Sequence, residues 1–104
     1  MINFNLIGLR IKKLRKNNSL TQEMLAEKID VSTEHMSRIE TGAIRPSLTV
    51  IEKLANVFSV SEEELMFGNK NEKSAINELF ERFGGFSEKQ IEILKLIVQL
   101  IDEN

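Results

Sequence analysis

The stretch QEMLAEKIDVSTEHMSRIETG, residues 22–42, decides the fold of this chain. Its apolar residues recur at the spacing of two short helices that each bury one side. These residues are Leu25, Ala26, Ile29, Val31, Met36 and Ile39. The second helix keeps a free face of short polar side chains and one arginine. Such a face suits contact with a partner better than burial in a core.

Further helices are predicted on both sides of this stretch, and no segment alternates as a β-strand does. Helical spacing of apolar residues places a first helix at about residues 6–16 and a short fifth helix at residues 61–67. The segment between Pro46 and the fifth helix carries a stripe that is expected to be buried. The stripe consists of Leu48, Ile51, Leu54, Ala55 and Phe58. Residues 1–68 are therefore predicted to form an all-α domain of five helices.

Four of the predicted helix starts share one signature. An apolar residue precedes a hydroxyl side chain that can cap the helix, and a second apolar residue follows five positions after the first. The four hydroxyl residues are Thr21, Ser32, Ser61 and Ser87. Gly42 is predicted to end the second short helix in a left-handed conformation, because glycine adopts that conformation without steric cost.

Composition excludes several classes of protein. The chain has 104 residues, enough for one compact domain and a small appended unit. It contains no cysteine and a single histidine, His35, so we expect neither a metal site nor a cofactor. No apolar run approaches the roughly 20 residues that cross a bilayer, and we expect no secretion signal, because no short apolar stretch follows a basic start with a cleavage site. A cytoplasmic protein without a membrane partner is expected.

A net charge of −2 conceals a local basic run. The run consists of Arg10, Lys12, Lys13, Arg15 and Lys16, and it contains no acidic residue. Local charge matters more than net charge for a phosphate partner. The run is either part of a phosphate-binding surface or a solvated helix face.

The composition changes after residue 68. Residues 69–73 are predicted to be a linker, and residues 74–104 a C-terminal two-helix hairpin broken at Gly84 and Gly85. Apolar side chains cover about 220° of the last helix, which is more than one short partner helix can bury. Either the first domain or a second copy of the chain must cover the rest. We predict dimerisation through Ile91, Leu94, Ile97, Val98 and Ile101.

Residues 7–67 resemble the lambda-repressor-like, or Cro-type, helix-turn-helix domain of bacterial and phage transcription regulators. The resemblance rests on an ordered set of short motifs. In order they are Ile11 with Leu14-Arg15, Leu20-Thr21-Gln22, Leu25-Ala26, Val31-Ser32, Ile39-Glu40 with Gly42, Pro46-Ser47-Leu48, Leu54-Ala55, and Val60 with Leu65. This chain departs from the family at Asp30, a position that is frequently glycine because the turn there has a positive φ.

The resemblance implies that the helix beginning near Thr33 enters the DNA major groove, with Thr33, Glu34 and Arg38 reading base edges. Arginine can donate two parallel hydrogen bonds to guanine, glutamate can accept from cytosine N4, and threonine can contact several bases. Glu34 has a second interpretation, as a solvated charge that the helix dipole favours near a helix N-terminus.

The resemblance also assigns contacts that carry no sequence information. Gln22, Ser32, Ser37 and Thr41 would contact DNA phosphate or sugar, and Lys13, Lys16 and Arg45 would either add charge or remain solvated. Arg15 and Glu40 would form a structural ion pair that joins the first helix to the third and orients the latter.

These features predict a sequence-specific regulator of transcription that binds double-stranded DNA, a repressor that acts as a homodimer on a palindromic operator. The alternative is an antitoxin-like or adaptor protein that binds a protein partner through its apolar C-terminal helices. An enzyme is not expected, because the sequence contains no nucleophile with a base, no glycine-rich phosphate loop and no metal cluster.

Overall fold

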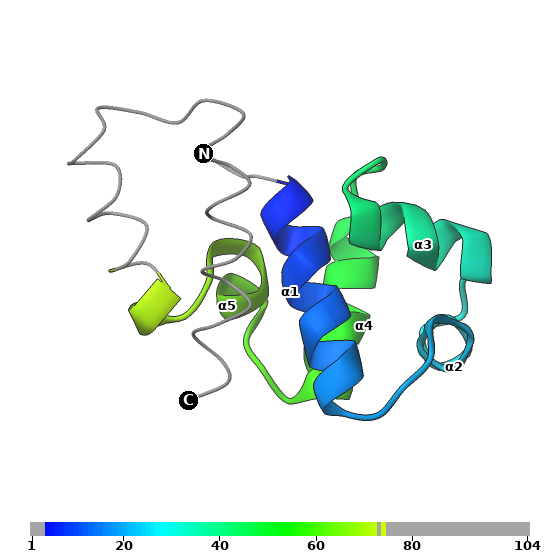
Figure 1. The fold of residues 1–104 in the computed structure, drawn as a ribbon, viewed down its shortest axis with the longest axis horizontal. Coiled ribbons are helices and arrows are strands. Elements are labelled where there is room, and N and C mark those ends of the chain that lie inside the picture. The colour runs from blue at the N-terminus through cyan, green and yellow to red at the C-terminus, as the bar shows by residue number, and fades with distance from the viewer. Residues whose placement is uncertain (1–3, 73, 75–104) are drawn as a thin grey trace. The chain divides into compact units, whose positions relative to one another are not determined.

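Five α-helices make up the first part of the chain. The computed structural model describes residues 4–72 and residue 74. In chain order the helices are α1 (Phe4–Asn17), α2 (Gln22–Lys28), α3 (Thr33–Thr41), α4 (Leu48–Phe58) and α5 (Glu62–Phe67). Figure 1 shows α1 in front of α4, with α2 and α3 together to one side. The prediction of an all-α arrangement with five helices in this region is confirmed.

A single core joins these helices. α1 packs against α3, α4 and α5, while α2 packs mainly on α3. The fully buried side chains come from all five helices and from the end of α2, as the apolar spacing in the sequence predicts. The largest are Ile7, Ile11, Leu25, Ile29, Met36, Ile39, Leu54 and Leu65.

Leu48 corrects the predicted stripe on α4. Its side chain is 78% exposed, although it lies three positions before the buried Ile51. Leu48 is the first residue of α4, and helical side chains lean toward the N-terminus of their helix. A side chain in the first position therefore projects past the end of the helix and does not reach the core. Val50, which is 9% exposed, is buried in the first turn in its place.

Side-chain caps fix the starts of α2, α3 and α5. The Thr21 hydroxyl accepts a hydrogen bond from the Met24 amide at 3.1 Å. Ser32 and Ser61 cap α3 and α5 in the same way, with bonds of 3.0 Å from the amides three residues later. These three predicted caps are confirmed, and the fourth, Ser87, lies outside the described residues.

The turn between α2 and α3 has the conformation expected from the resemblance. Asp30 has a φ of 59°, and the Val31 amide then donates to the Ala26 carbonyl at 3.0 Å. Ala26 is 1% exposed, so its small side chain allows α2 and α3 to lie close together. At the far end of α3, Gly42 has a φ of 80° and ends the helix as predicted.

The chain divides into two compact units, residues 1–67 and residues 68–104. Within the described part of the second unit, residues 70–72 are helical, and the Asn69 side chain accepts from the Glu72 amide at 2.9 Å. The described part of the predicted linker is thus a capped helical turn. The predicted hairpin, including Gly84, Gly85 and the dimerisation residues of the last helix, lies outside the described residues. No helix in the described ranges has the length and apolar character needed to cross a membrane.

Candidate nucleic-acid interface

A buried ion pair joins α1 to α3. Arg15 Nε lies 2.7 Å from Glu40 Oε2, and Arg15 Nη2 donates to Glu40 Oε1 at 3.0 Å. The two side chains are only 10% and 1% exposed. A third bond, from Arg15 Nη1 to the Leu20 carbonyl at 2.9 Å, ties the pair to the loop before α2. This bidentate geometry fixes direction as well as distance, so α3 is held at one orientation relative to α1.

Gln22, at the start of α2, also bonds to this pair. Its Nε2 donates to Glu40 Oε1 at 3.1 Å. The Glu40 carboxylate therefore connects α1, α2 and α3. The sequence resemblance had assigned Gln22 to phosphate and Glu40 to Arg15 separately, and it did not predict the bond between the two. An amide nitrogen carries two hydrogens, so this bond leaves Gln22 with one further donor.

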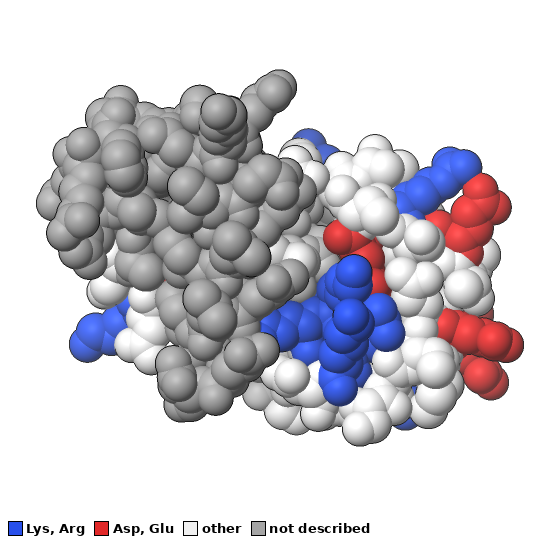
Figure 2. All heavy atoms as spheres, viewed as in Figure 1, with Lys and Arg blue, Asp and Glu red and all other residues white. Residues whose placement is uncertain are grey.

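The basic run on α1 is not a continuous solvated face. Arg10, Lys13 and Arg15 are 8%, 9% and 9% exposed, whereas Lys12 and Lys16 are exposed. Arg10 Nη1 donates to the carbonyls of Leu65 and Met66 at 3.3 and 2.9 Å. Arg10 thus satisfies backbone acceptors in the last turn of α5. In Figure 2, basic side chains gather over α1, while acidic side chains lie over α2 and α3.

The first half of α3 presents an open polar face. Ser32, Thr33 and Glu34 are exposed, and His35 is half-buried. The Ser32 oxygen accepts the His35 amide, which leaves the hydroxyl hydrogen available to a ligand. The capped N-terminus of α3 adds the positive end of its dipole to this face. Together these groups offer hydrogen-bond donors to an anionic or polar partner.

Two of the predicted base-reading residues contact each other. Arg38 Nη2 lies 2.7 Å from Glu34 Oε1, with the side chains 58% and 76% exposed. The two residues are four positions apart on α3, so their helical spacing allows an ion pair. This pair was not predicted from the sequence. Thr33, the third predicted base reader, precedes them on the same exposed half of the helix.

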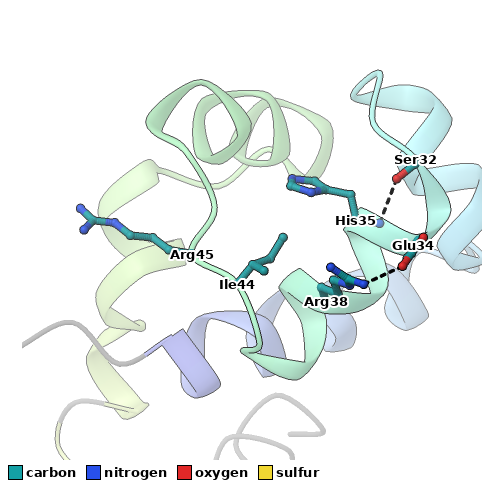
Figure 3. Close-up of a pocket in the computed structure, with 6 residues that line it drawn as sticks. All are labelled: Ser32, Glu34, His35, Arg38, Ile44 and Arg45. Atoms are coloured by element: carbon teal, nitrogen blue, oxygen red, sulfur yellow. Dashed lines mark hydrogen bonds and ion pairs between the residues drawn. The ribbon is translucent and has the colours of Figure 1, made fainter.

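These side chains border a concavity of about 450 Å³ between α3 and the loop that follows it. Figure 3 shows its lining residues, which are Ser32, Glu34, His35, Arg38, Ile44 and Arg45. The Arg45 side chain points away from the other five. Its guanidinium lies 5.6 Å from the centre of the Phe4 ring, a cation–π distance that ties the loop to the start of α1.

Ser37 and Thr41, the remaining residues predicted to contact phosphate, are less available to a DNA backbone. Ser37 is half-buried, and the Thr41 hydroxyl donates to the Arg38 carbonyl at 3.2 Å. Thr41 would have to give up this bond to donate to a phosphate oxygen. Among residues 4–72 and 74, no group of three or more acidic or histidine side chains is placed to hold a metal ion.

This geometry has a counterpart among known proteins. The helix-turn-helix family profile HTH_3 matches residues 11–65. The chain belongs to the helix-turn-helix family. The match spans α2 and α3 together with most of the core around them, so the resemblance drawn from the sequence is confirmed.

Proteins similar to this chain include repressors and other regulators of transcription. It is 33% identical over 79 residues to the immunity repressor protein of Bacillus phage phi105, across 64% of this chain and 55% of that protein. The chain thus spans about half the length of this relative. It is similar to the P22 c2 repressor, solved in complex with a synthetic operator, with 26% identity and a TM-score of 0.59. That similarity covers 62% of this chain and 97% of the P22 chain.

A third similarity extends further along the sequence. A chain of the SinR protein/SinI protein complex matches with 30% identity and a TM-score of 0.57, across 94% of this chain and 99% of that one. The helix-turn-helix protein described here is therefore related in sequence to phage repressors and similar in fold to chains from both a DNA complex and a protein complex.

Proposed function

We propose that this helix-turn-helix protein is a sequence-specific regulator of transcription that binds double-stranded DNA and acts as a repressor. The observation that carries the proposal is the exposed first half of α3, held at one orientation by the contacts of the buried Glu40 side chain with Arg15 and Gln22. A reading helix must be both accessible and fixed in direction. Similarity to a repressor solved with its operator supports the same function.

In this proposal α3 enters the major groove and presents Thr33, Glu34 and Arg38 to base edges. All three side chains are exposed, as direct readout requires. Arg38 donates to guanine, Glu34 accepts from cytosine N4, and Thr33 contacts a base through its hydroxyl or methyl group.

Phosphate contacts come mainly from the start of each motif helix. Gln22 uses the amide hydrogen that does not bond to Glu40, and Ser32 uses its hydroxyl hydrogen. Ser37 and Thr41 contribute further phosphate contacts where the DNA backbone passes the middle and the end of α3. Such contacts set the register of the protein on DNA and do not read sequence.

A single reading helix contacts too few base pairs to specify an operator. We therefore propose a homodimer in which two copies of α3 lie about 34 Å apart, one helical turn of DNA, on a palindromic site. The predicted apolar face of the last helix is the proposed dimer contact.

Selection of bound duplexes from random DNA, repeated at two salt concentrations, tests this function. We expect a palindromic consensus at both concentrations, with affinity that falls as salt rises because phosphate contacts release counterions. Binding that depends steeply on salt but shows no preferred sequence would contradict the proposal.

A protein partner is the second candidate function, and one observation favours it. The similarity to a chain of the SinR protein/SinI protein complex extends over 94% of this chain, well past α5. In this alternative, the apolar C-terminal helices bind another protein, and DNA binding is secondary. Purification from its native cells with a partner in equal amount, together with no selected sequence for the protein alone, would favour this candidate.

A further inference from the structure

We infer that Glu34 is a positioning residue for Arg38, and that the pair reads one G·C base pair as a unit. The inference rests on the proposed DNA-binding function. It adds to that function a specific target, one G·C base pair, and a separate role for each of the two residues. Arg38 makes the contact with guanine, while Glu34 sets the direction of the guanidinium and makes binding conditional on the cytosine opposite.

The geometry of the pair places Arg38 along the part of α3 that reads bases. Arg38 Nη2 bonds Glu34 Oε1 at 2.7 Å, one turn toward the start of the helix (Figure 3). The bond directs the guanidinium toward the exposed N-terminal half of α3. Without Glu34, a 58% exposed arginine side chain would sample many rotamers and reach phosphates as readily as bases.

The pair keeps enough hydrogen-bonding capacity for a base pair. Within the described chain, the bond engages one nitrogen of Arg38 and one oxygen of Glu34, so Nε, Nη1 and Oε2 have no other partner there. The remaining hydrogens of Arg38 suffice for two parallel bonds to guanine O6 and N7. Glu34 Oε2 can accept from cytosine N4, which lies on the same major-groove edge. A G·C pair therefore matches the donors and acceptors of both residues together.

Charge explains why such a pair increases selectivity. A carboxylate beside DNA is repelled by the phosphates, so Glu34 weakens binding to every sequence. The cost is offset only where a cytosine amino group donates to the free oxygen. A thymine O4 at the same place would face the carboxylate as a second acceptor. Glu34 thus discriminates against wrong sites more than it strengthens the correct one.

The experiment compares wild type with Glu34→Gln, Arg38→Ala and the double variant on three duplexes. The first duplex is the sequence selected by wild type, and the second replaces the base pair at which Arg38→Ala relaxes specificity by A·T. The third duplex has a random sequence. Glu52→Gln, which removes the same charge from the exposed face of α4, is the matched control.

We expect Arg38→Ala to relax specificity at a G·C pair. Glu34→Gln should bind the random duplex more tightly than wild type, and its preference for the selected duplex over the A·T duplex should fall about tenfold. In the Arg38→Ala background, Glu34→Gln should cause no further loss of preference, because the two residues act as a unit. Glu52→Gln should keep the wild-type preference, and all variants should melt as wild type does because these side chains are exposed.

Three results would overturn the inference and leave the proposed function intact. Glu34→Gln could keep the full preference, the two variants could lose preference additively, or Arg38→Ala could relax specificity at a pair other than G·C. A wild-type protein that prefers no sequence would instead overturn the proposed function, and the inference with it.

Discussion

Residues in left-handed backbone conformations mark the helix ends of this domain. Within the described chain, Ser19, Asp30 and Ser59 have positive φ values of 55–59° without being glycine. Asp30 separates the two motif helices, so its strain falls on the turn that sets their angle. Left-handed backbone costs an ordinary residue on the order of 1 kcal/mol, while aspartate tolerates it better than alanine and glycine best of all.

We predict opposite effects for two substitutions at this turn. Asp30→Ala should lower the free energy of unfolding by about 1 kcal/mol, because alanine lacks the local hydrogen bonds that help aspartate adopt this conformation. Asp30→Gly should leave it unchanged or raise it. Urea unfolding of the two variants measures the difference. Equal destabilisation by both would show that the aspartate side chain, and not its φ, matters at this position.

Arg38→Ala separates a base contact from a phosphate contact. The side chain is exposed, so melting should stay close to that of wild type. Binding to the preferred duplex should weaken by roughly 1–3 kcal/mol, with little change on random DNA. Binding curves on both duplexes at one salt concentration provide the measurement. An equal loss on both would reassign Arg38 to a phosphate.

Sequence reasoning succeeded at single residues where the cause is local. The caps at Thr21 and Ser32 and the left-handed Gly42 depend on neighbours within a few positions, and all were predicted. Arg10 could not be assigned in this way, because its carbonyl partners are 55 and 56 residues away. Leu48 was wrongly predicted as buried because helical spacing ignores where a helix begins.

At the scale of elements, α1 and α3 touch through their backbones at Gly8. A Cβ atom built on Gly8 would lie 2.4 Å from the Ile39 carbonyl oxygen and 2.5 Å from that of Glu40. Neither oxygen can move without moving α3, since both belong to its backbone. Gly8 therefore sets how closely α3 approaches α1.

Gly8→Ala should force the two helices apart. We expect a loss of about 1–3 kcal/mol in the free energy of unfolding, as for other overpacked cores, together with weaker binding to the selected duplex. Lys12→Ala on the exposed side of the same helix is the matched control and should melt like wild type. Thermal melting and duplex binding test both effects, and a Gly8→Ala variant with wild-type stability would show that α1 and α3 separate without cost.

The carboxylate of Glu40 connects three helices, so its removal should affect stability and binding together. Glu40→Ala leaves the Arg15 guanidinium buried without its partner, which should cost on the order of 3 kcal/mol. It also removes the acceptor of the Gln22 amide. Melting and duplex binding should both fall, whereas Glu52→Ala on the exposed face of α4 should change neither. A Glu40→Ala variant that melts like wild type would remove the orienting role.

Sequence spacing predicted the existence and order of the five helices, because each buries one apolar stripe. It did not predict which polar groups meet between helices. The Gln22–Glu40 bond joins residues 18 positions apart, and its geometry exists only after α2 and α3 have packed. Which part of the α1 basic run stays solvated was likewise decided by packing, since three of its five residues are buried.

At the scale of the whole molecule, the proposal gives one chain two functions, DNA binding and dimerisation. The first unit carries α3, the proposed reading helix, and the last helix is proposed to bring two copies together. The solved chain of the P22 c2 repressor matches over 97% of its own length and over 62% of this chain, so that chain has about the length of the first unit. The two functions should therefore separate on truncation.

Removal of residues 69–104 should give a monomer that still unfolds cooperatively, because the core cluster of the described residues lies within residues 4–66. The full chain should be a dimer at micromolar concentration, and analytical ultracentrifugation distinguishes the two states. Affinity for the palindrome should fall toward that of a half-site, since the two reading helices are no longer linked.

Point variants in the full chain test whether the apolar face itself, and not the mere removal of a long segment, accounts for the loss of the dimer. Leu94→Asp places a charge on the predicted apolar face and should give a monomer, whereas Lys95→Asp changes the neighbouring position on the predicted polar strip and should stay dimeric. A truncated protein or a Leu94→Asp variant that remained dimeric would place the dimer interface in the first unit. In that case, the apolar C-terminal face would be available to bind a different protein, as the second candidate function requires.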